Sequence, residues 1–549
     1  MVDYNILLGG EAGQGMNTVG GVLEKIFTRT GYYIFATKDY MSRIRGGHNF
    51  NCIRISDEPI YTHRESIDML IAFNEETIEL HEKHLLKDGL VIDEKAYPFK
   101  ELAKEIGNIK VIGTVMVGAV IKMLGLSTDI AEGVLKEYFS GDILRMNISA
   151  LEKGYDLVDK KVTLPSVAAP KKTITLNGNQ AVGLGALAAG CKFFSGYPMT
   201  PGTGIMNYIA AKQHELGIVV EQSEDEIAAL NMVIGASYAG VRAMTSTSGG
   251  GYSLMVEAVG LSGIIETPAV IANVQRPGPA TGLPTRTAQG DLHFVLYASQ
   301  DEIPRMVIAL RSVEEAFYQT IRAFNLADKY QIPVTILSDQ YLADAQTTIL
   351  PYDFSAVKIE KHLADVQGIG KERYKRYKIT EDGISPRIIP GKIPGQVVMV
   401  DSDEHDEYGH IIESDTERIQ MMDKRMQKIE TLKSDIQEPW YVGSEKPETL
   451  IVGWGSTYCV IKTVIEALEK QGKSIGALIY GDVCPLPVAL FNDYAANANN
   501  IIAVEGNYSG QLADLIQQKT CIPIKIRLTK YDGRAWGYEE LQAKIQEVL

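Results

Sequence analysis

The chain has 549 residues, of which 45% are hydrophobic and 22% are charged. These proportions are typical of a soluble globular protein, and the length predicts about three domains rather than a single core. The formal net charge of −15 argues against nucleic acid as the main partner, and no apolar run reaches membrane-spanning length. We therefore expect a cytoplasmic protein with neither nucleic-acid nor membrane partners.

The first predicted domain covers residues 1–162 and opens with an apolar strand, Tyr4–Leu8, a glycine-rich turn, Gly10–Asn17, and a helix. Glycines let a ligand approach the backbone, and the N–H groups at a helix start favour a phosphate. The glycine spacing differs from the dinucleotide fingerprint G-x-G-x-x-G, so spacing alone favours a structural turn. Ser42–His48 adds positive charge nearby in sequence, and we interpret His48 as structural.

A Pro/Ala linker, residues 163–172, leads to a second predicted domain at 173–350, in which strand and helix patterns alternate. Its first strand, Lys192–Phe194, enters the turn Ser195–Pro201. Two prolines fix the backbone around Thr200 and hold its hydroxyl in one place. The turn is therefore a candidate ligand site.

Glu226 opens a run of small and apolar residues that continues with helical spacing to Ala239. A carboxylate at the start of a small-residue helix can approach a ligand closely. An enzyme that uses thiamine diphosphate needs such a carboxylate against the aminopyrimidine ring, where it promotes the tautomer that accepts the proton of the thiazolium carbon. The alternative interpretation is a solvated acid that complements the helix dipole.

Two further predicted strands end in loops suited to ligands. Ala243–Thr247 runs into Ser248–Gly251, where glycines allow close approach, and Ile264–Gln275 delivers the loop Arg276–Arg286. Arginine binds carboxylates in a forked geometry, which suits an anionic 2-oxoacid. Either loop alone is more often a structural turn, but at successive strand ends the two loops predict a binding site.

Residues 351–447 are charged and irregular, with one predicted helix, Glu417–Lys433. His405 lies there among acids. A metal site would have no defined ligand set, so we favour a solvated or interface-forming turn and predict no metal site. The last domain, 448–549, begins with a strand. The predicted fold class is therefore α/β, divided over several domains.

Two absences bear on function. The five cysteines are far apart and form no C-x-x-C pair, which excludes a self-contained ferredoxin-type cluster and fits a reducing compartment. Thiamine diphosphate also needs a half-site that holds its diphosphate through a divalent metal, usually marked by Gly-Asp-Gly. That half-site is expected on a partner, because no glycine follows the Gly-Asp pairs of this chain, Gly141-Asp142, Gly290-Asp291 and Gly481-Asp482.

With these motifs the chain resembles, over essentially its whole length, the alpha subunit of the 2-oxoacid:ferredoxin oxidoreductases with the gamma domain fused at its N-terminus. Tyr197–Pro201 stands where the family has Tyr-Pro-Ile-Thr-Pro, with Met199 in place of isoleucine. The resemblance implies a gamma-type domain, a thiamine-diphosphate pyrimidine-binding domain and a transketolase C-terminal-like domain. It places Glu505–Gln511 at a domain or subunit interface.

The resemblance also implies roles for individual residues. Thr200, Arg276 and Thr285 would contact the 2-oxoacid, and Glu226 would contact the pyrimidine. Coenzyme A becomes the expected ligand of the glycine-rich turn. The candidate catalytic residues are Glu226, Thr200, Arg276 and Thr285, and the candidate cofactor-binding residues are Tyr197, Pro198, Thr200, Glu226, Ser248, Gly249, Gly13, Gln14, Gly15, Asn17 and Arg43.

The implied reaction is the coenzyme A-dependent oxidative decarboxylation of a 2-oxoacid, with electrons passed to ferredoxin. A beta subunit would carry the diphosphate half-site with its Mg²⁺ and a [4Fe-4S] cluster, in a heterotetramer of two alpha and two beta subunits. The fused layout favours 2-oxoglutarate, with branched-chain 2-oxoacids or pyruvate as alternatives. Two other classes stay open at this point: a thiamine enzyme subunit that transfers no electrons, and a non-catalytic nucleotide- or coenzyme A-binding module.

Overall fold

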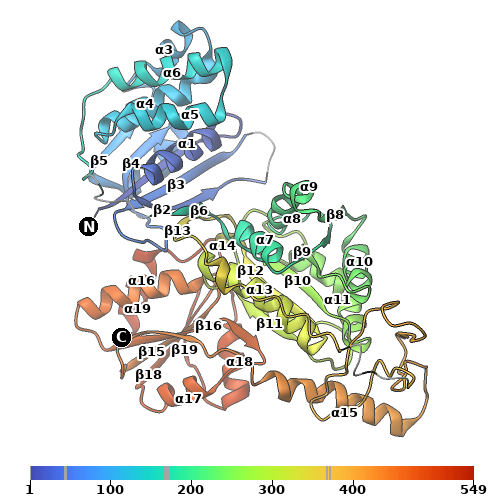
Figure 1. Cartoon of the computed structure of the whole chain (residues 1–549). Coiled ribbons are helices and arrows are strands. Elements are labelled where there is room, and N and C mark those ends of the chain that lie inside the picture. The colour runs from blue at the N-terminus through green and yellow to red at the C-terminus, as the bar shows by residue number, and fades with distance from the viewer. Residues whose placement is uncertain (1, 43–45, 166, 168–171, 366–368, 370–371) are drawn as a thin grey trace. The chain divides into compact units, whose positions relative to one another are not determined.

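The computed structural model describes residues 2–42, 46–165, 167, 172–365, 369 and 372–549, and Figure 1 shows their helices and strands. Arg43, a candidate coenzyme A residue, lies outside the described residues. The chain divides into two compact units. The N-terminal unit comprises residues 1–177, 344–351 and 537–543, and the larger unit comprises residues 178–343, 352–536 and 544–549. Within the described part of the chain, no helix is both long and apolar enough to cross a membrane.

The N-terminal unit is a seven-stranded sheet in the order β5-β4-β1-β3-β2-β13-β6, with helices packed on it (Figure 1). The predicted strand Tyr4–Leu8 is the centre of β1, and alternate side chains such as Ile6 and Leu8 enter the main core of this unit. The strands are β1 (Asp3–Glu11), β2 (Tyr33–Asp39), β3 (His48–Ser56), β4 (Ile67–Ala72), β5 (Leu85–Ile92), β6 (Ile174–Leu176) and β13 (Gln346–Ile349), and the helices are α1 (Met16–Arg29), α2 (Glu75–His81), α3 (Phe99–Glu105), α4 (Ile112–Met123), α5 (Thr128–Tyr138) and α6 (Gly141–Asp156).

The first sheet of the larger unit has the order β17-β11-β12-β10-β9-β7-β8, and every pairing except β11 with β17 is parallel. Its central strands β9, β10 and β12 are buried along their whole length because helices cover both faces. The strands are β7 (Phe193–Gly196), β8 (Val219–Gln222), β9 (Ala243–Thr247), β10 (Ala269–Gln275), β11 (Met306–Ala309), β12 (Pro333–Asp339) and β17 (Asp482–Cys484), and the helices are α7 (Gly178–Ala188), α8 (Thr203–Ala210), α9 (Gln213–Leu216), α10 (Glu226–Tyr238), α11 (Gly249–Ile264), α12 (Leu292–Tyr297), α13 (Val313–Tyr330) and α14 (Gln340–Asp344).

The second sheet of the larger unit has the order β14-β16-β15-β18-β19, with β14 antiparallel to β16 and the other pairs parallel. Buried side chains of β15 and β16 join those of the first sheet in one hydrophobic core. The strands are β14 (Trp440–Gly443), β15 (Thr449–Trp454), β16 (Ile475–Tyr480), β18 (Asn500–Glu505) and β19 (Ile526–Thr529), and the helices are α16 (Thr457–Lys470), α17 (Ala489–Ala495) and α18 (Gln511–Thr520). The last helix, α19 (Tyr538–Val548), is divided between the two units after residue 543.

Helix α15 (Asp415–Leu432) is the long helix of the otherwise irregular segment before β14. It corresponds to the predicted helix Glu417–Lys433, with slightly different first and last residues. It buries two lysines: the Nζ atoms of Lys424 and Lys428 each lie 2.5 Å from a carboxylate oxygen of Glu266, and all three side chains are buried. Burial lowers the pKa of Lys424 to about 7. Although burial opposes it, the charges of the two lysines hold the pKa of Glu266 below its ordinary value. This charge cluster fastens α15 to the end of α11.

The expectation of a solvated turn at His405 is wrong, while the alternative of an interface-forming turn stays a prediction. The residue is fully buried, and its ring centroid lies 3.8 Å from that of Tyr377. Its Nδ1 atom lies 3.0 Å from the carbonyl oxygen of Asp403. Acidic neighbours in the sequence suggested exposure, but one of them, Glu404, is itself paired with Arg425 of α15. The described residues contain no group of three or more His, Cys, Asp and Glu side chains placed to hold a metal.

We predict that Glu266→Gln lowers the free energy of unfolding by about 3–5 kcal/mol, because it leaves two buried lysines without a counter-charge. Denaturant unfolding monitored by circular dichroism measures the change. The control is Glu430→Gln, which removes an exposed partner of Lys433 on the same helix and should change stability by less than about 0.5 kcal/mol. Equal effects of the two substitutions would contradict the prediction.

Candidate active site

The ends of three neighbouring parallel strands place the predicted loops together. β7 pairs with β9 and β9 with β10, so their carboxyl ends lie at one edge of the sheet (Figure 1). The loop after β7 carries Thr200 and the loop after β10 carries Arg276. These two residues are in contact, since Arg276 Nη1 donates a hydrogen bond of 2.6 Å to the carbonyl oxygen of Thr200. Sequence reasoning therefore identified two residues that do share one site.

Glu226 is the first residue of α10, and the alternative of a solvated first-turn acid is wrong. The side chain of Asp225 caps the helix by accepting from the Ala228 N–H at 2.8 Å, so Glu226 is not needed for capping. Glu226 is only 3% exposed, and within the described part of the chain its Oε1 atom has no hydrogen-bond partner. Burial raises the pKa of Glu226, and the neighbouring charge of Asp225 adds to the shift.

A glycine makes room for this carboxylate. A Cβ atom at Gly251, in the first turn of α11, would lie 2.6 Å from Glu226 Oε1 and 2.1 Å from Thr247 Oγ1. The triple-glycine loop noted in the sequence therefore lets α11 begin directly against Glu226. The candidate residues Ser248 and Gly249 lie at the same helix start, with Ser248 as the N-cap.

Several other buried polar atoms at these strand ends have no partner. They are Thr245 Oγ1 and Ser248 Oγ at the end of β9 and Asn273 Oδ1 near the end of β10. Buried polar atoms are nearly always hydrogen-bonded, and leaving one unpaired costs about 1–3 kcal/mol. Such a concentration beside Glu226 indicates a place for a polar ligand. Asn273 lay inside a predicted strand, and nothing in its sequence position marked it as a site residue.

The remaining candidates of this region are more open. Tyr197 and Pro198 are exposed, and Thr285 is half-buried in the loop that follows Arg276. Among the described residues, Thr285 makes no hydrogen bond to Arg276 or Thr200. The structure thus brings Thr200 and Arg276 together but does not bring Thr285 into direct contact with them.

The glycine-rich turn of the N-terminal unit is an open helix start. Gly13 and Gly15 have φ angles of 96° and 82°, and a Cβ at either would meet no atom within 4 Å. Gln14 Oε1 accepts from the Glu11 N–H at 2.8 Å, which closes the turn, while Asn17 is exposed in the first turn of α1. Among the described residues, no side chain caps the start of α1, and the N–H groups of a first helical turn have no acceptor within the helix.

His48, close to that turn, is a buried residue in an aromatic cluster. Its Nε2 atom lies 2.8 Å from Nε2 of His81, and its ring stacks on Phe50 at 5.7 Å. Burial lowers the pKa of His48. This packing agrees with the structural role expected for His48.

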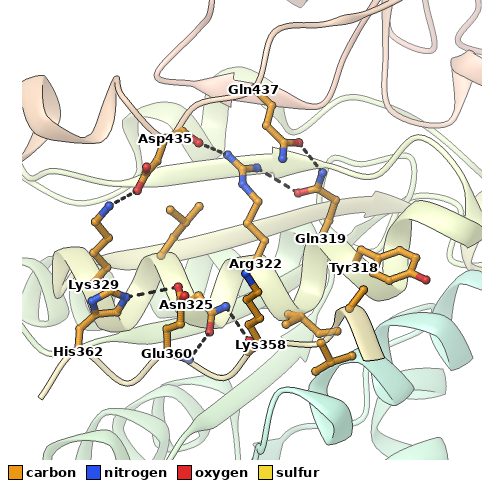
Figure 2. A pocket seen from close by; sticks show the side chains of 14 residues that line it. Tyr318, Gln319, Arg322, Asn325, Lys329, Lys358, Glu360, His362, Asp435 and Gln437 are labelled. Atoms are coloured by element: carbon orange, nitrogen blue, oxygen red, sulfur yellow. Dashed lines mark hydrogen bonds and ion pairs between the residues drawn. The ribbon is translucent and has the colours of Figure 1, made fainter. Parts of the chain in front are cut away.

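A groove of about 460 Å³ lies apart from these strand ends, along α13 (Figure 2). None of the candidate residues lines it. Arg322 in its wall is paired through two hydrogen bonds of 2.7 and 2.6 Å with Asp482, and Lys329 is paired with Asp435 at 2.5 Å. These pairs connect α13 to β17 and to the segment between α15 and β14, so the groove walls are already bound to one another.

Comparison with known proteins identifies the family. Residues 184–424 match the family model described as pyruvate flavodoxin/ferredoxin oxidoreductase, thiamine diphosphate-binding, and residues 5–157 match the model described as pyruvate ferredoxin/flavodoxin oxidoreductase. The 2-oxoacid:ferredoxin oxidoreductase subunit alpha of a Sulfolobus species is 34% identical over 615 aligned residues, covering 99% of this chain and 96% of the relative. The chain belongs to the 2-oxoacid:ferredoxin oxidoreductase family, as its resemblance predicted.

Two further relatives carry more specific names. The 2-oxoglutarate synthase subunit KorA of Methanothermobacter thermautotrophicus is 35% identical over 67% of this chain and 96% of its own length. The solved structure of the 2-oxoglutarate:ferredoxin oxidoreductase from Magnetococcus marinus, with 2-oxoglutarate, coenzyme A and succinyl-CoA bound, matches with a TM-score of 0.93 and 31% identity. It covers 100% of this chain and 99% of that one.

The strand-end residues fit the pyrimidine of thiamine diphosphate. Glu226 offers a buried carboxyl oxygen without a partner, and Ser248 and Asn273 offer two more unpaired polar atoms. The missing side chain at Gly251 leaves room for the carboxyl at the start of α11. A carboxyl with a raised pKa can hold a proton for a ring nitrogen, which is the chemistry this cofactor needs.

We predict that Gly251→Ala weakens thiamine diphosphate binding to the assembled protein at least about tenfold, because the added methyl group displaces Glu226 and Thr247. Calorimetric titration with the cofactor measures the change. Gly133→Ala in α5 is the matched control, since a Cβ there meets no atom within 4 Å. An unchanged dissociation constant in a folded Gly251→Ala protein would show that this helix start lies outside the cofactor site.

Proposed function

We propose that the chain is the part of a 2-oxoacid:ferredoxin oxidoreductase that binds the cofactor pyrimidine and the 2-oxoacid, with 2-oxoglutarate as its substrate. The products are succinyl-CoA, carbon dioxide and reduced ferredoxin. The observation that carries this proposal is Glu226, a buried carboxyl with an unpaired oxygen at a glycine helix start. A structural role gives no reason for leaving that oxygen unpaired.

Arg276 supports an anionic substrate. Its guanidinium is half-buried, and one nitrogen is held by the carbonyl oxygen of Thr200, which fixes the orientation of the fork. Its other nitrogens remain for a carboxylate. Two named relatives, the Methanothermobacter and Magnetococcus proteins, act on or bind 2-oxoglutarate. Branched-chain 2-oxoacids and pyruvate are the alternative substrates.

A partner chain completes the site in this proposal. When bound, thiamine diphosphate supplies the nucleophilic carbon for decarboxylation. Glu226 holds a proton at its Oε1 atom for the pyrimidine nitrogen, and the enclosed position excludes water from that contact. Exposed apolar residues surround the entrance, namely Ile227 and Met232 of α10 and Leu254 of α11, and these fit burial under a second chain. A beta subunit of this kind would bring the diphosphate half-site, Mg²⁺ and the iron–sulfur cluster.

The glycine-rich turn supports a coenzyme A site in the N-terminal unit. Its open N–H groups and left-handed glycines suit the phosphates of that co-substrate. Gly13, Gln14, Gly15 and Asn17 would contribute. Coenzyme A acts only after decarboxylation, so this turn should influence acyl transfer and not the first half of the reaction.

We predict that Glu226→Gln lowers decarboxylation of 2-oxoglutarate at least about a hundredfold in the assembled enzyme, because an amide cannot supply the proton of a carboxyl. Reduction of ferredoxin is measured across 2-oxoglutarate, branched-chain 2-oxoacids and pyruvate, and cofactor binding is measured by calorimetry. Glu224→Gln, an exposed neighbour, is the control. If the wild-type assembly oxidises none of these acids, the proposed function fails. If Glu226→Gln turns over normally, only the role of Glu226 fails.

We predict that Asn17→Asp raises the KM for coenzyme A about tenfold and leaves decarboxylation unchanged, because the new carboxylate repels phosphates at the helix start. An acid in a first helical turn stabilises the helix, so loss of folding does not explain the effect. Asn17→Ser serves as the neutral control. A normal KM in the aspartate variant would place coenzyme A elsewhere.

A further inference from the structure

Asp291 attracted notice in the sequence only as part of a Gly-Asp pair without a following glycine. In the structure it occupies the N-cap position of the short helix α12, a few residues after the loop Arg276–Arg286, without a capping hydrogen bond from its side chain among the described residues. Its backbone N–H donates to Gln275 Oε1 at 2.9 Å, and its Oδ2 atom accepts from Asn273 Nδ2 at 3.1 Å. Both partners lie at the end of β10, directly before Arg276. Asp291 is thus attached to the strand that delivers the arginine.

The same carboxylate lies against the start of α11. A Cβ atom at Gly249 would come within 2.5 Å of Asp291 Oδ2. The bond from Asn273 to Asp291 uses the amide nitrogen of Asn273, while its amide oxygen is buried and has no hydrogen-bond partner among the described residues. Asp291 therefore contacts both the strand end and the helix start that form the candidate active site.

Arg276 and Asp291 are coupled by charge. Burial lowers the pKa of Arg276, and the charge of Asp291 opposes that shift. Burial likewise raises the pKa of Asp291, opposed by the Asn273 hydrogen bond and by the charge of Arg276. Each group therefore stabilises the charged form of the other in an environment that disfavours both charges.

The C-terminal domain holds the loop that carries Asp291. Gln289 makes four hydrogen bonds to this domain. Its backbone N–H donates to the Gly506 carbonyl oxygen at 2.7 Å, and its backbone carbonyl accepts from Asn507 Nδ2 at 3.1 Å. Its side chain accepts from the Gly506 N–H at 2.8 Å through Oε1 and donates to the Trp454 carbonyl oxygen at 2.8 Å through Nε2. Gln511 Nε2 donates to Gly290 O at 2.8 Å. The ends of β15 and β18 thereby fix the residues immediately before Asp291.

We propose that Asp291 is a positioning residue: through its hydrogen bonds to the end of β10 and its negative charge it orients the Arg276 guanidinium for the carboxylate of the 2-oxoacid, and the loop Glu505–Gln511 holds Asp291 in place. The inference rests on the proposed function, since it assigns the same site a further residue. It also gives Glu505–Gln511, expected only to form an interface, a role in substrate binding.

A double-mutant cycle of Asp291→Asn and Arg276→Lys in the assembled enzyme tests the proposal. Asp291→Asn should raise the KM for 2-oxoglutarate about tenfold while kcat falls less than about threefold, because the loss lies in substrate binding. The double variant should be no worse than Arg276→Lys alone, since Asp291 acts through Arg276. Asp301→Asn, which removes an exposed partner of Arg418, is the control.

The outcomes separate this inference from the proposed function. Additive effects in the cycle, or an unchanged KM in Asp291→Asn, would overturn the role of Asp291. Titration of 2-oxoglutarate onto the assembled protein without coenzyme A gives a second readout, and a wild type that neither binds nor oxidises the acid would refute the proposed function itself. If Asp291→Asn does not fold, Gln511→Ala is tested instead, because it removes the hydrogen bond that holds Gly290 beside Asp291. An unchanged KM for 2-oxoglutarate in Gln511→Ala would also overturn the proposal.

Discussion

The parallel pairing of β7, β9 and β10 is the constraint on which the candidate site depends. Parallel strands deliver their carboxyl ends to one edge, so loops separated by about thirty to eighty residues in the sequence meet without any further requirement. The contact of Arg276 with the Thr200 carbonyl follows from this pairing. The glycines of α11 then determine how closely the helix start can approach Glu226.

Two buried glutamates show how a site can be distinguished from a structural cluster. Glu266 has two lysines at 2.5 Å, and their charges hold its pKa below the ordinary value despite burial. Glu226 is equally buried, has no cation beside it, and its pKa is raised. In the first arrangement, the negative charge of Glu266 is compensated by lysines of the same chain. The second is unfavourable for the isolated chain, and it becomes favourable only when a ligand supplies the missing partner.

Sequence reasoning identified the parts of the site that are marked locally. Glu226 stands at a helix start, Arg276 follows an apolar strand, and both could be read from their immediate neighbours. Asn273 and Asp291 could not, because their importance arises from contacts between a strand end and a residue in the loop beyond it. The same limitation explains the error at His405, where acidic neighbours suggested solvent but a distant helix supplied the cations that allow burial. Arg43 lies outside the described residues, so it stays a prediction.

The C-terminal domain acts on the site through a chain of hydrogen bonds that begins at a buried acid. Glu505 accepts from the indole of Trp454, from the side chain of Asn507 and from the backbone N–H groups of Leu512 and Ala513, which orders the loop after β18. That loop binds Gln289, and the residues next to Gln289 carry Asp291 toward Arg276. Hydrogen bonds run from Glu505 to the residues beside Asp291, and Asp291 is in turn bonded to Asn273 and Gln275 at the strand end that precedes Arg276. A domain without candidate catalytic residues of its own can therefore still determine how a substrate is held.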